Sequence, residues 1–173
     1  MKLKKLPLFI QMLYDEEETI MSYMDMFSLK GKVALVTGGS YGIGFAIARA
    51  YARAGARIAF NCRSQEHLDT AMAAYAKEGI DAKGYICDVT DTEKVRDMVA
   101  DIDASIGTID ILVNNAGIIK RIPMCDMDEA DFRQVIDIDL VAPFIVSKAV
   151  IPGMIAKGEG KIINICSMMS ELG

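Results

Sequence analysis

The chain has 173 residues, of which 52% are hydrophobic and 25% charged, and its formal net charge is −5 at pH 7. This length suffices for one domain with a sizeable core, and the composition is that of an ordinary globular protein. The negative charge argues against nucleic acid or an anionic membrane as a partner, because both bind clusters of Lys and Arg. No segment approaches the roughly 20 apolar residues that span a bilayer.

The first 27 residues differ in pattern from the rest. Residues 1–5 are basic and residues 6–13 mostly apolar, but an acidic run at 15–18 follows where the cleavage site of a signal peptide should be. We therefore interpret residues 1–27 as an N-terminal extension, with Met24 or Met26 as an alternative start. The expected compartment is the cytoplasm.

The four cysteines lie far apart and form no C-x-x-C pair: Cys62, Cys87, Cys125 and Cys166. Such spacing indicates neither a disulfide framework nor a zinc site, and it suits a reducing compartment. We expect all four to be small buried hydrophobic residues, and we predict no metal site.

From residue 29 onward, strand-like and helix-like stretches alternate, without repeats or low-complexity linkers. Gly55 and Gly79 end the first two helices, as C-terminal glycines do. The alternation predicts an α/β fold, a Rossmann-type doubly wound parallel sheet with helices on both faces, in residues 28–173. The predicted strands are 32–36, 57–60, 85–87, 109–113 and 161–165, and the predicted helices are 43–54, 65–78, 92–106 and 129–156.

A glycine-rich turn, Thr37-Gly38-Gly39-Ser40-Tyr41-Gly42-Ile43-Gly44, joins the first predicted strand to the first helix. The pyrophosphate of a dinucleotide binds at such a turn, because glycines allow close backbone approach and the helix N-terminus offers N–H donors and a positive dipole. No Lys-Ser or Lys-Thr follows Gly44, which disfavours a P-loop nucleoside triphosphatase. A methyltransferase can also use a glycine-rich first turn, so the turn alone leaves the class open.

Four motifs in order make the sequence resemble the short-chain dehydrogenase/reductase family. They are the Thr-Gly-x-x-x-Gly-x-Gly turn, Asp88-Val89 after the third strand, Asn114 to Gly117 after the fourth, and Ile163 to Ser167 on the fifth. The resemblance runs from Leu29 to Gly173 without a gap. It is greatest to the gluconate 5-dehydrogenase group, chiefly through residues 160–173.

The resemblance implies a role for each matching residue. Asp88 and Val89 would hold the adenine, and Ser167 would hydrogen-bond the reacting oxygen of a ketone or alcohol substrate. Asn115 has an equal structural interpretation, because an Asn at a strand end often only ties backbone segments together. The remaining cofactor-binding residues implied are Gly38, Ser40, Tyr41, Gly42, Ile43 and Gly44 around the pyrophosphate, and Asn115, Ala116 and Gly117 along the wall of the cleft.

The end of the second strand bears on the choice of cofactor. NAD-selective Rossmann proteins place an Asp or Glu there to accept hydrogen bonds from the ribose, and the residue at that position is Cys62. Arg63 follows, and its planar guanidinium suits a phosphate. We therefore favour NADP over NAD, with a solvated Arg63 as the alternative.

Two features depart from the family pattern. Asp139 stands where the family has a catalytic Asn whose carbonyl holds a proton-relay water. Pro143 lacks the N–H that would bond that carbonyl, so the relay geometry could survive, although a plain proline kink is an equal alternative. Moreover, neither Tyr nor Lys occurs after Lys161, so the Tyr-x-x-x-Lys of the family is not in this sequence.

We therefore interpret the chain as a member truncated before that motif, with a sheet incomplete at its C-terminal edge. The first hypothesis is a fragment of an oxidoreductase that interconverts a ketone and a secondary alcohol of a small polyol or sugar acid, such as 5-ketogluconate and gluconate. The parent would be a homo-oligomer, a dimer or tetramer. The alternatives are a non-catalytic dinucleotide-binding or interaction protein, and a merely structural fragment.

Overall fold

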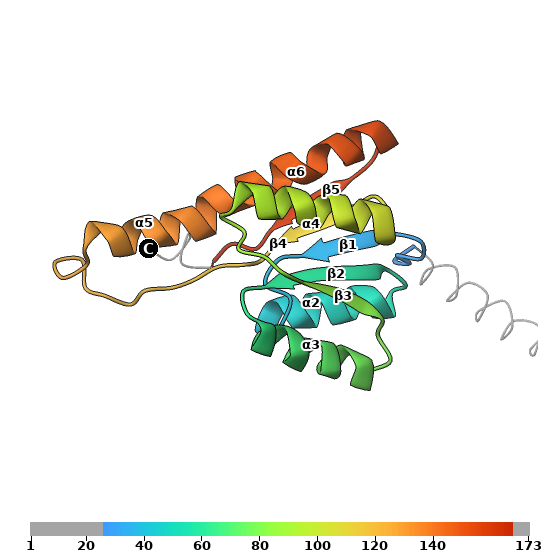
Figure 1. Ribbon diagram of the computed structural model, residues 1–173, viewed down its shortest axis with the longest axis horizontal. Coiled ribbons are helices and arrows are strands. Elements are labelled where there is room, and N and C mark those ends of the chain that lie inside the picture. The colour runs from blue at the N-terminus through green and yellow to red at the C-terminus, as the bar shows by residue number, and fades with distance from the viewer. Residues whose placement is uncertain (1–25, 168–173) are drawn as a thin grey trace, which may run out of the picture.

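A computed structural model describes residues 26–167 of the chain. Within these residues five parallel strands form one sheet in the order β3-β2-β1-β4-β5 (Figure 1). The chain starts at the centre of the sheet, extends to one edge, and returns to extend to the other, which confirms the predicted doubly wound order. The strands are β1 (Val33–Val36), β2 (Arg57–Cys62), β3 (Ala82–Ile86), β4 (Ile111–Asn114) and β5 (Lys161–Asn164).

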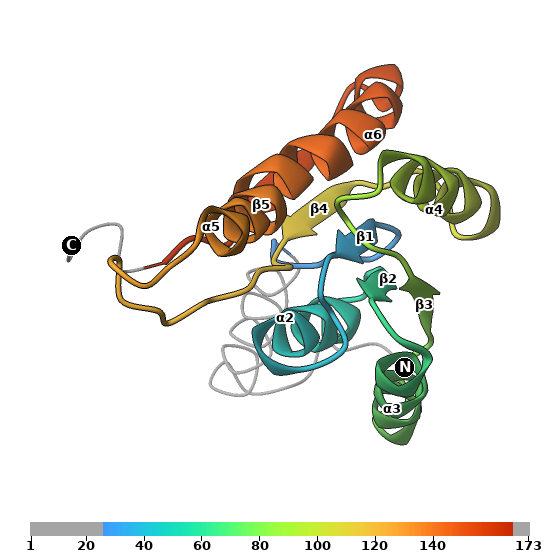
Figure 2. The ribbon, with the colours of Figure 1, turned by 60° about the vertical axis from the view of Figure 1, so that its left-hand side comes forward.

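Helices cover both faces of the sheet, as predicted. α2 (Gly42–Arg53) and α3 (Gln65–Lys77) lie on one face. α4 (Thr92–Ser105) and a long continuous helix lie on the other (Figures 1 and 2). That long helix consists of α5 (Glu129–Ile136), the π-helical segment η1 (Asp137–Val141) and α6 (Ala142–Lys157).

The core has two layers, one on each side of the sheet. Phe60 and Tyr75 are the largest fully buried side chains between the sheet and helices α2 and α3. On the opposite face Leu35 and Leu112 pack against Ile102 of α4 and Val146 of α6. All four residues of β1 are at most 1% exposed. Its uniformly apolar sequence is therefore the consequence of burial on both faces.

Strands β2 and β3 are longer than the sequence predicts. The predictions were 57–60 and 85–87, whereas the two strands pair over five residues, from Ile58 with Ala82 to Cys62 with Ile86. The added residues include Asn61, Lys83 and Gly84, which have weak strand propensity. Pairing with a neighbouring strand overrides that local preference.

The long helix is distorted just before Pro143, as the sequence predicts. The backbone N–H of Ala142 bonds the carbonyl of Asp137, five residues earlier, and Asp139 lies at the centre of the π-helical turn. Pro143 has no N–H to close the regular bond to Asp139. The proline thus accounts for the change in helix type, and such π segments are frequent at functional sites.

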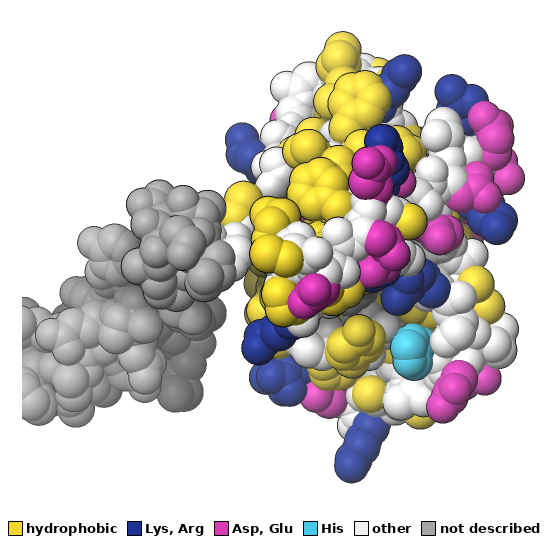
Figure 3. All heavy atoms as spheres, turned by 90° about the vertical axis from the view of Figure 1, so that its left-hand side faces the viewer, with side chains coloured by type: hydrophobic (Ala, Val, Ile, Leu, Met, Phe, Trp, Pro, Cys, Tyr) yellow, Lys and Arg dark blue, Asp and Glu magenta, His cyan; other side chains and the backbone are white. Residues whose placement is uncertain are grey.

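The expectation that no segment is long and apolar enough to span a bilayer was wrong for the long helix. The helix Glu129–Lys157 has 29 residues and a most apolar 18-residue window with a mean hydropathy of 1.7, enough to cross a membrane by length and composition alone. Only part of its apolar surface is in the core, through Ala142, Val146, Val150 and Met154. Figure 3 shows apolar side chains gathered on the face at the α5 end of the molecule. Large apolar side chains are exposed along the same helix and on β5: Phe132, Leu140, Phe144, Ile155, Ile162 and Ile163.

Candidate functional site

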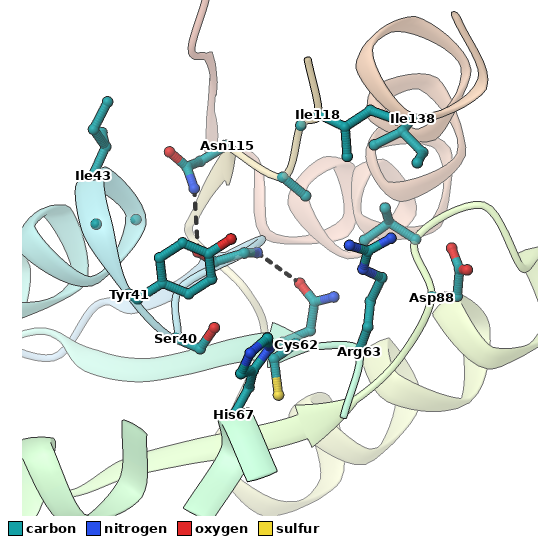
Figure 4. A pocket seen from close by; sticks show the side chains of 17 residues that line it. Ser40, Tyr41, Ile43, Cys62, Arg63, His67, Asp88, Asn115, Ile118 and Ile138 are labelled. Atoms are coloured by element: carbon teal, nitrogen blue, oxygen red, sulfur yellow. Dashed lines mark hydrogen bonds between the residues drawn. The ribbon is translucent and has the colours of Figure 1, made fainter. Parts of the chain in front are cut away.

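The loops that follow β1, β2, β3 and β4 enclose a cleft of about 220 Å³ at the carboxyl edge of the sheet (Figure 4). In doubly wound sheets ligands bind at this edge, at the point where the strand order reverses. Every residue that the sequence predicts to bind a dinucleotide lines this cleft: Gly38, Ser40, Tyr41, Gly42, Ile43, Gly44, Arg63, Asp88, Val89, Asn115, Ala116 and Gly117. Asn61, Cys62, His67, Ile118 and Ile138 complete the lining.

The turn between β1 and α2 needs glycine for two different reasons. Gly38 and Gly42 have φ angles of 63° and 60°, in the left-handed region where other residues are strained. Gly44 instead lacks room, because an added Cβ would lie 2.4 Å from the carbonyl oxygen of Gly38 and 2.5 Å from Nδ2 of Asn115. The turn is therefore held by both conformation and close packing.

The N-terminus of α2 differs from those of the other helices that begin beside a loop. Side chains of Ser64, Asp91 and Asp128 cap α3, α4 and α5, whereas Tyr41 at the start of α2 makes no side-chain cap. No side chain at the N-cap accepts from the first-turn N–H groups of α2, so these groups can donate to another acceptor. A pyrophosphate is such an acceptor, and the helix dipole favours its charge. The residues present therefore fit a dinucleotide.

Asn115 ties the end of β4 to the glycine-rich turn. Its Nδ2 donates to the carbonyl oxygens of Thr37 at 3.0 Å and Gly38 at 3.3 Å. The backbone N–H groups of Asn115 and Ala116 both donate to the Thr37 hydroxyl at 2.9 Å. These contacts agree with the structural interpretation of Asn115, while its place in the cleft wall also puts it beside any ligand.

Sequence reasoning missed two residues that support the same turn. Asn61, 2% exposed, accepts a hydrogen bond from the Gly38 N–H at 3.1 Å and donates to the Cys87 carbonyl at 2.8 Å. The Tyr75 hydroxyl donates to the carbonyl of Gly39 at 2.7 Å. The signal for Asn61 was present, since an Asn inside the apolar run of β2 needs polar partners.

The end of β3 presents a carboxylate to the cleft. Asp88 accepts hydrogen bonds from the backbone N–H of Thr90 at 3.0 Å and from its hydroxyl at 2.7 Å. The pKa of Asp88 is below its usual value, chiefly because of the Thr90 N–H, and the charge of Arg63 acts in the same direction. Asp88 is therefore an ionised acceptor at neutral pH.

The end of β2 carries no charge of its own. Cys62 is 4% exposed, and burial raises the pKa of its thiol. Its Sγ donates to the carbonyl of Ser64 at 3.4 Å, and Arg63 beside it is exposed in the cleft. The site where an NAD-selective protein has a carboxylate is thus neutral and adjoins a cation.

The expectation for the cysteines holds for two of the four. Cys62 and Cys87 are buried, and burial raises the pKa of the Cys87 thiol to about 11. Cys125 and Cys166 are exposed, and they lie in the loop before α5 and after the end of β5. Within residues 26–167 no group of three or more His, Cys, Asp or Glu side chains could hold a metal ion.

The two residues expected to take part in catalysis lie outside the lining of the cleft. Asp139 adjoins it, since its Oδ1 accepts a hydrogen bond of 2.9 Å from the N–H of Ile118, which is part of the lining. Ser167 follows β5 by three residues and is exposed. Because β5 pairs with β4 up to Asn114 and Asn164, Ser167 continues toward the same carboxyl edge.

A family model described as short chain dehydrogenase matches residues 32–173. The chain belongs to the short chain dehydrogenase family. The family explains why a doubly wound sheet carries a glycine-rich turn after its first strand and Asn114 to Gly117 after its fourth, as the sequence resemblance implied.

Three similar proteins have names that describe enzymes acting on sugar acids. A 2-dehydro-3-deoxy-D-gluconate 5-dehydrogenase of Formosa agariphila is 54% identical over 87% of this chain and 57% of its own length. The crystal structure of a 2-keto-3-deoxy-D-gluconate dehydrogenase from Streptococcus agalactiae is 67% identical, with a TM-score of 0.78, over 88% of this chain and 57% of that one.

A gluconate 5-dehydrogenase from Burkholderia cenocepacia, crystallised with NADP and tartrate, is 42% identical, with a TM-score of 0.81, over 87% of this chain and 59% of that one. The present chain therefore spans less than two thirds of the length of these three relatives.

Proposed function

We propose that the chain is the cofactor-binding part of an NADP-dependent oxidoreductase that interconverts a ketone and a secondary alcohol of a small sugar acid. The observation that carries the proposal is the uncapped N-terminus of α2, which opens into a cleft that Arg63 also lines. Both features suit the phosphates of NADP. The similar proteins named for gluconate and 2-keto-3-deoxygluconate support a substrate such as 5-ketogluconate or 2-keto-3-deoxygluconate.

Each part of the cleft has its own task in this proposal. The first turn of α2 and the turn from Gly38 to Gly44 bind the pyrophosphate, and Asp88 accepts from the adenine amino group beside Val89. Arg63 binds the 2′-phosphate. When bound, the nicotinamide supplies or accepts the hydride. Asn115, Ala116 and Gly117 would wall its place, and the Thr37 hydroxyl fixes the backbone N–H groups of Asn115 and Ala116.

The reacting oxygen of the substrate meets Ser167 and the region of Asp139. The Ser167 hydroxyl donates a hydrogen bond to that oxygen and stabilises the negative charge that develops on it during reduction. The backbone carbonyl of Asp139, freed by Pro143, holds a water of the proton relay. The acid–base pair itself belongs to a Tyr-x-x-x-Lys segment that residues 162–173 do not include.

A non-catalytic dinucleotide-binding protein is the second candidate function. It is favoured by one observation, that all the residues lining the nucleotide cleft fall within residues 38–138. For the parent enzyme we propose a homo-oligomer in the cytoplasm, with the exposed apolar side of the long helix and β5 inside the assembly.

Two measurements separate these functions. Fluorescence titration of the 173-residue chain with NADPH should give saturable binding, and a chain extended through Tyr-x-x-x-Lys should oxidise NADPH when 5-ketogluconate or 2-keto-3-deoxygluconate is added. Binding without turnover in the extended chain would support the non-catalytic alternative. Absence of binding in both chains would overturn the assignment of the cleft.

A further inference from the structure

His67 is the one histidine of the chain, and it lines the dinucleotide cleft. It is the third residue of α3, the helix that follows β2, and its side chain is exposed. Side chains on a helix lean toward its N-terminus, which directs the imidazole back toward the end of β2. In the view of Figure 4, His67 lies between Tyr41 and Arg63.

The imidazole is held from the opposite wall by an aromatic contact. The ring centroids of His67 and Tyr41 lie 5.8 Å apart with an interplanar angle of 59°, a tilted arrangement favourable for aromatic pairs. Tyr41 belongs to the glycine-rich turn, so the contact bridges the pyrophosphate side of the cleft and the helix after β2. The imidazole therefore has a defined place between the glycine-rich turn and the first turn of α3.

The ionisable groups around this place are few. Tyr41 from the glycine-rich turn, Cys62 at the end of β2, Arg63 and Asp88 line the cleft with His67. The Cys62 thiol is neutral because burial raises its pKa, and Asp88 is already engaged by Thr90 and by the charge of Arg63. On α3 itself, Glu66 directly precedes His67 and Asp69 follows it by two residues.

The ribose of a dinucleotide lies at the end of the second strand of a Rossmann fold, so a 2′-phosphate would lie between Arg63 and the first turn of α3. A phosphate monoester carries a charge of about −1.5 to −2 at pH 7. One guanidinium does not neutralise that charge. A second cation, at His67, would complete the neutralisation. An imidazole becomes cationic between about pH 5 and 8.

We propose that protonated His67 is a second cationic contact for the 2′-phosphate, beside Arg63, so that the preference for 2′-phosphorylated nucleotides rises as the pH falls. The inference rests on the proposed NADP function of the cleft and adds its regulation by pH. An unphosphorylated nucleotide has nothing at this place for His67 to bind. The pH effect therefore falls on selectivity rather than on nucleotide binding in general.

The test uses 2′,5′-ADP and 5′-AMP, which differ only in the 2′-phosphate. Calorimetric titration of the chain at pH 8.0 and 6.5 should show the affinity ratio rising by up to about tenfold, the lower end of what one charge-assisted hydrogen bond contributes. His67→Gln should abolish the rise. Arg63→Ala should lower the ratio at both pH values and retain the rise. Thr70→Gln, at an exposed position one turn further along α3, is the control and should behave as the wild type.

Because the chain has a single histidine, its imidazole gives one set of NMR signals. Saturation with 2′,5′-ADP at pH 6.5 should shift these signals strongly, and saturation with 5′-AMP should shift them much less, because only the first ligand carries the 2′-phosphate. A 2′-phosphate preference that does not vary with pH, or that varies equally in His67→Gln, would overturn the inference and leave the NADP function standing. Equal affinity for the two nucleotides at both pH values would overturn both.

Discussion

The side-chain amide of Asn115 donates a hydrogen bond of 3.0 Å to the carbonyl oxygen of Thr37. The bond joins two loops that are 78 residues apart in the sequence, at the ends of neighbouring parallel strands. The same amide nitrogen occupies the space into which a side chain at Gly44 would grow. The pairing of β1 with β4 thus fixes the shape of the glycine-rich turn. The lack of space for a side chain at Gly44 can be tested by substitution.

Gly44→Ala should destabilise the fold by about 1–3 kcal/mol, the usual cost of overpacking, and weaken NADPH binding. Ala is normally the better helix former by about 1 kcal/mol, but its Cβ here would lie 2.4 Å from the Gly38 oxygen. Gly153→Ala in α6 is the matched control, since its nearest neighbour is a side-chain methyl of Thr108 at 3.0 Å. Thermal unfolding with and without NADPH measures both effects. Equal melting temperatures for the two variants would contradict the packing argument.

Arg63→Ala should weaken NADPH binding by about 1.5–3 kcal/mol, the value of a hydrogen bond to a charged group, and leave NADH binding nearly unchanged. The reason is that Cys62 is neutral and Arg63 is the cation next to it in the cleft. Arg96→Ala, on the exposed side of α4 where Arg96 pairs with Glu93, controls for loss of charge. Fluorescence titration with both cofactors checks the prediction. Identical curves for NADPH and NADH in the wild type would contradict it.

The parts of this site that sequence alone predicts are those built from neighbouring residues. The glycine-rich turn, the helix ends at Gly55 and Gly79 and the distortion at Pro143 follow from local stereochemistry, and the structure has each of them. Residues that sequence reasoning missed act across the sheet. Asn61 and Tyr75 reach the turn from β2 and α3, so their roles depend on strand order and register.

Ser167→Ala, in a chain extended through Tyr-x-x-x-Lys, should lower kcat for the sugar-acid substrate by about 10²–10³-fold, as loss of an oxyanion donor does. The affinity for NADPH should stay near that of the unaltered chain, because Ser167 lies outside the lining of the dinucleotide cleft. Stopped assays under saturating cofactor give kcat, and titration gives the affinity. A parallel loss of NADPH affinity would instead assign Ser167 a structural role.

Asp110→Ala should destabilise the protein by about 1–3 kcal/mol at pH 7, because the backbone N–H of buried Val33 loses its acceptor. Asp110, 3% exposed, accepts from that N–H at 2.8 Å and also from Lys157. Burial alone would raise the pKa of Asp110, but the hydrogen bonds from Lys157 and Val33 and the nearby positive charges outweigh burial and lower it.

The sign of the pH dependence follows from that lowered pKa. The unfolded state binds the proton more readily, so the contribution of Asp110 is complete above the ordinary pKa of an aspartate, about 3.9. It is lost as the pH falls through the lower folded value. The difference in urea midpoint between wild type and Asp110→Ala should therefore shrink between pH 5 and pH 2. A difference that is constant over this range would exclude an ionised Asp110 as its source.

The 173-residue chain should self-associate through β5 and the long helix. In the part of the chain that the structure describes, β5 pairs with β4 alone, and Ile163 is 39% exposed along the open edge. Unpaired strand edges with apolar side chains template pairing with other chains. Phe144 of α6, 64% exposed, adds apolar surface on the same side of the molecule.

Size-exclusion chromatography should therefore give species larger than a monomer, and Ile163→Lys with Phe144→Glu should shift them toward the monomer. Ile119→Lys, at a 73% exposed residue of the loop after β4, is the control and should leave the profile unchanged.

The self-associated chain should oxidise no NADPH, since the family's Tyr-x-x-x-Lys pair supplies a proton transfer worth about 10²–10⁴-fold. A monomeric wild-type chain with turnover above background would contradict both the edge argument and the catalytic one.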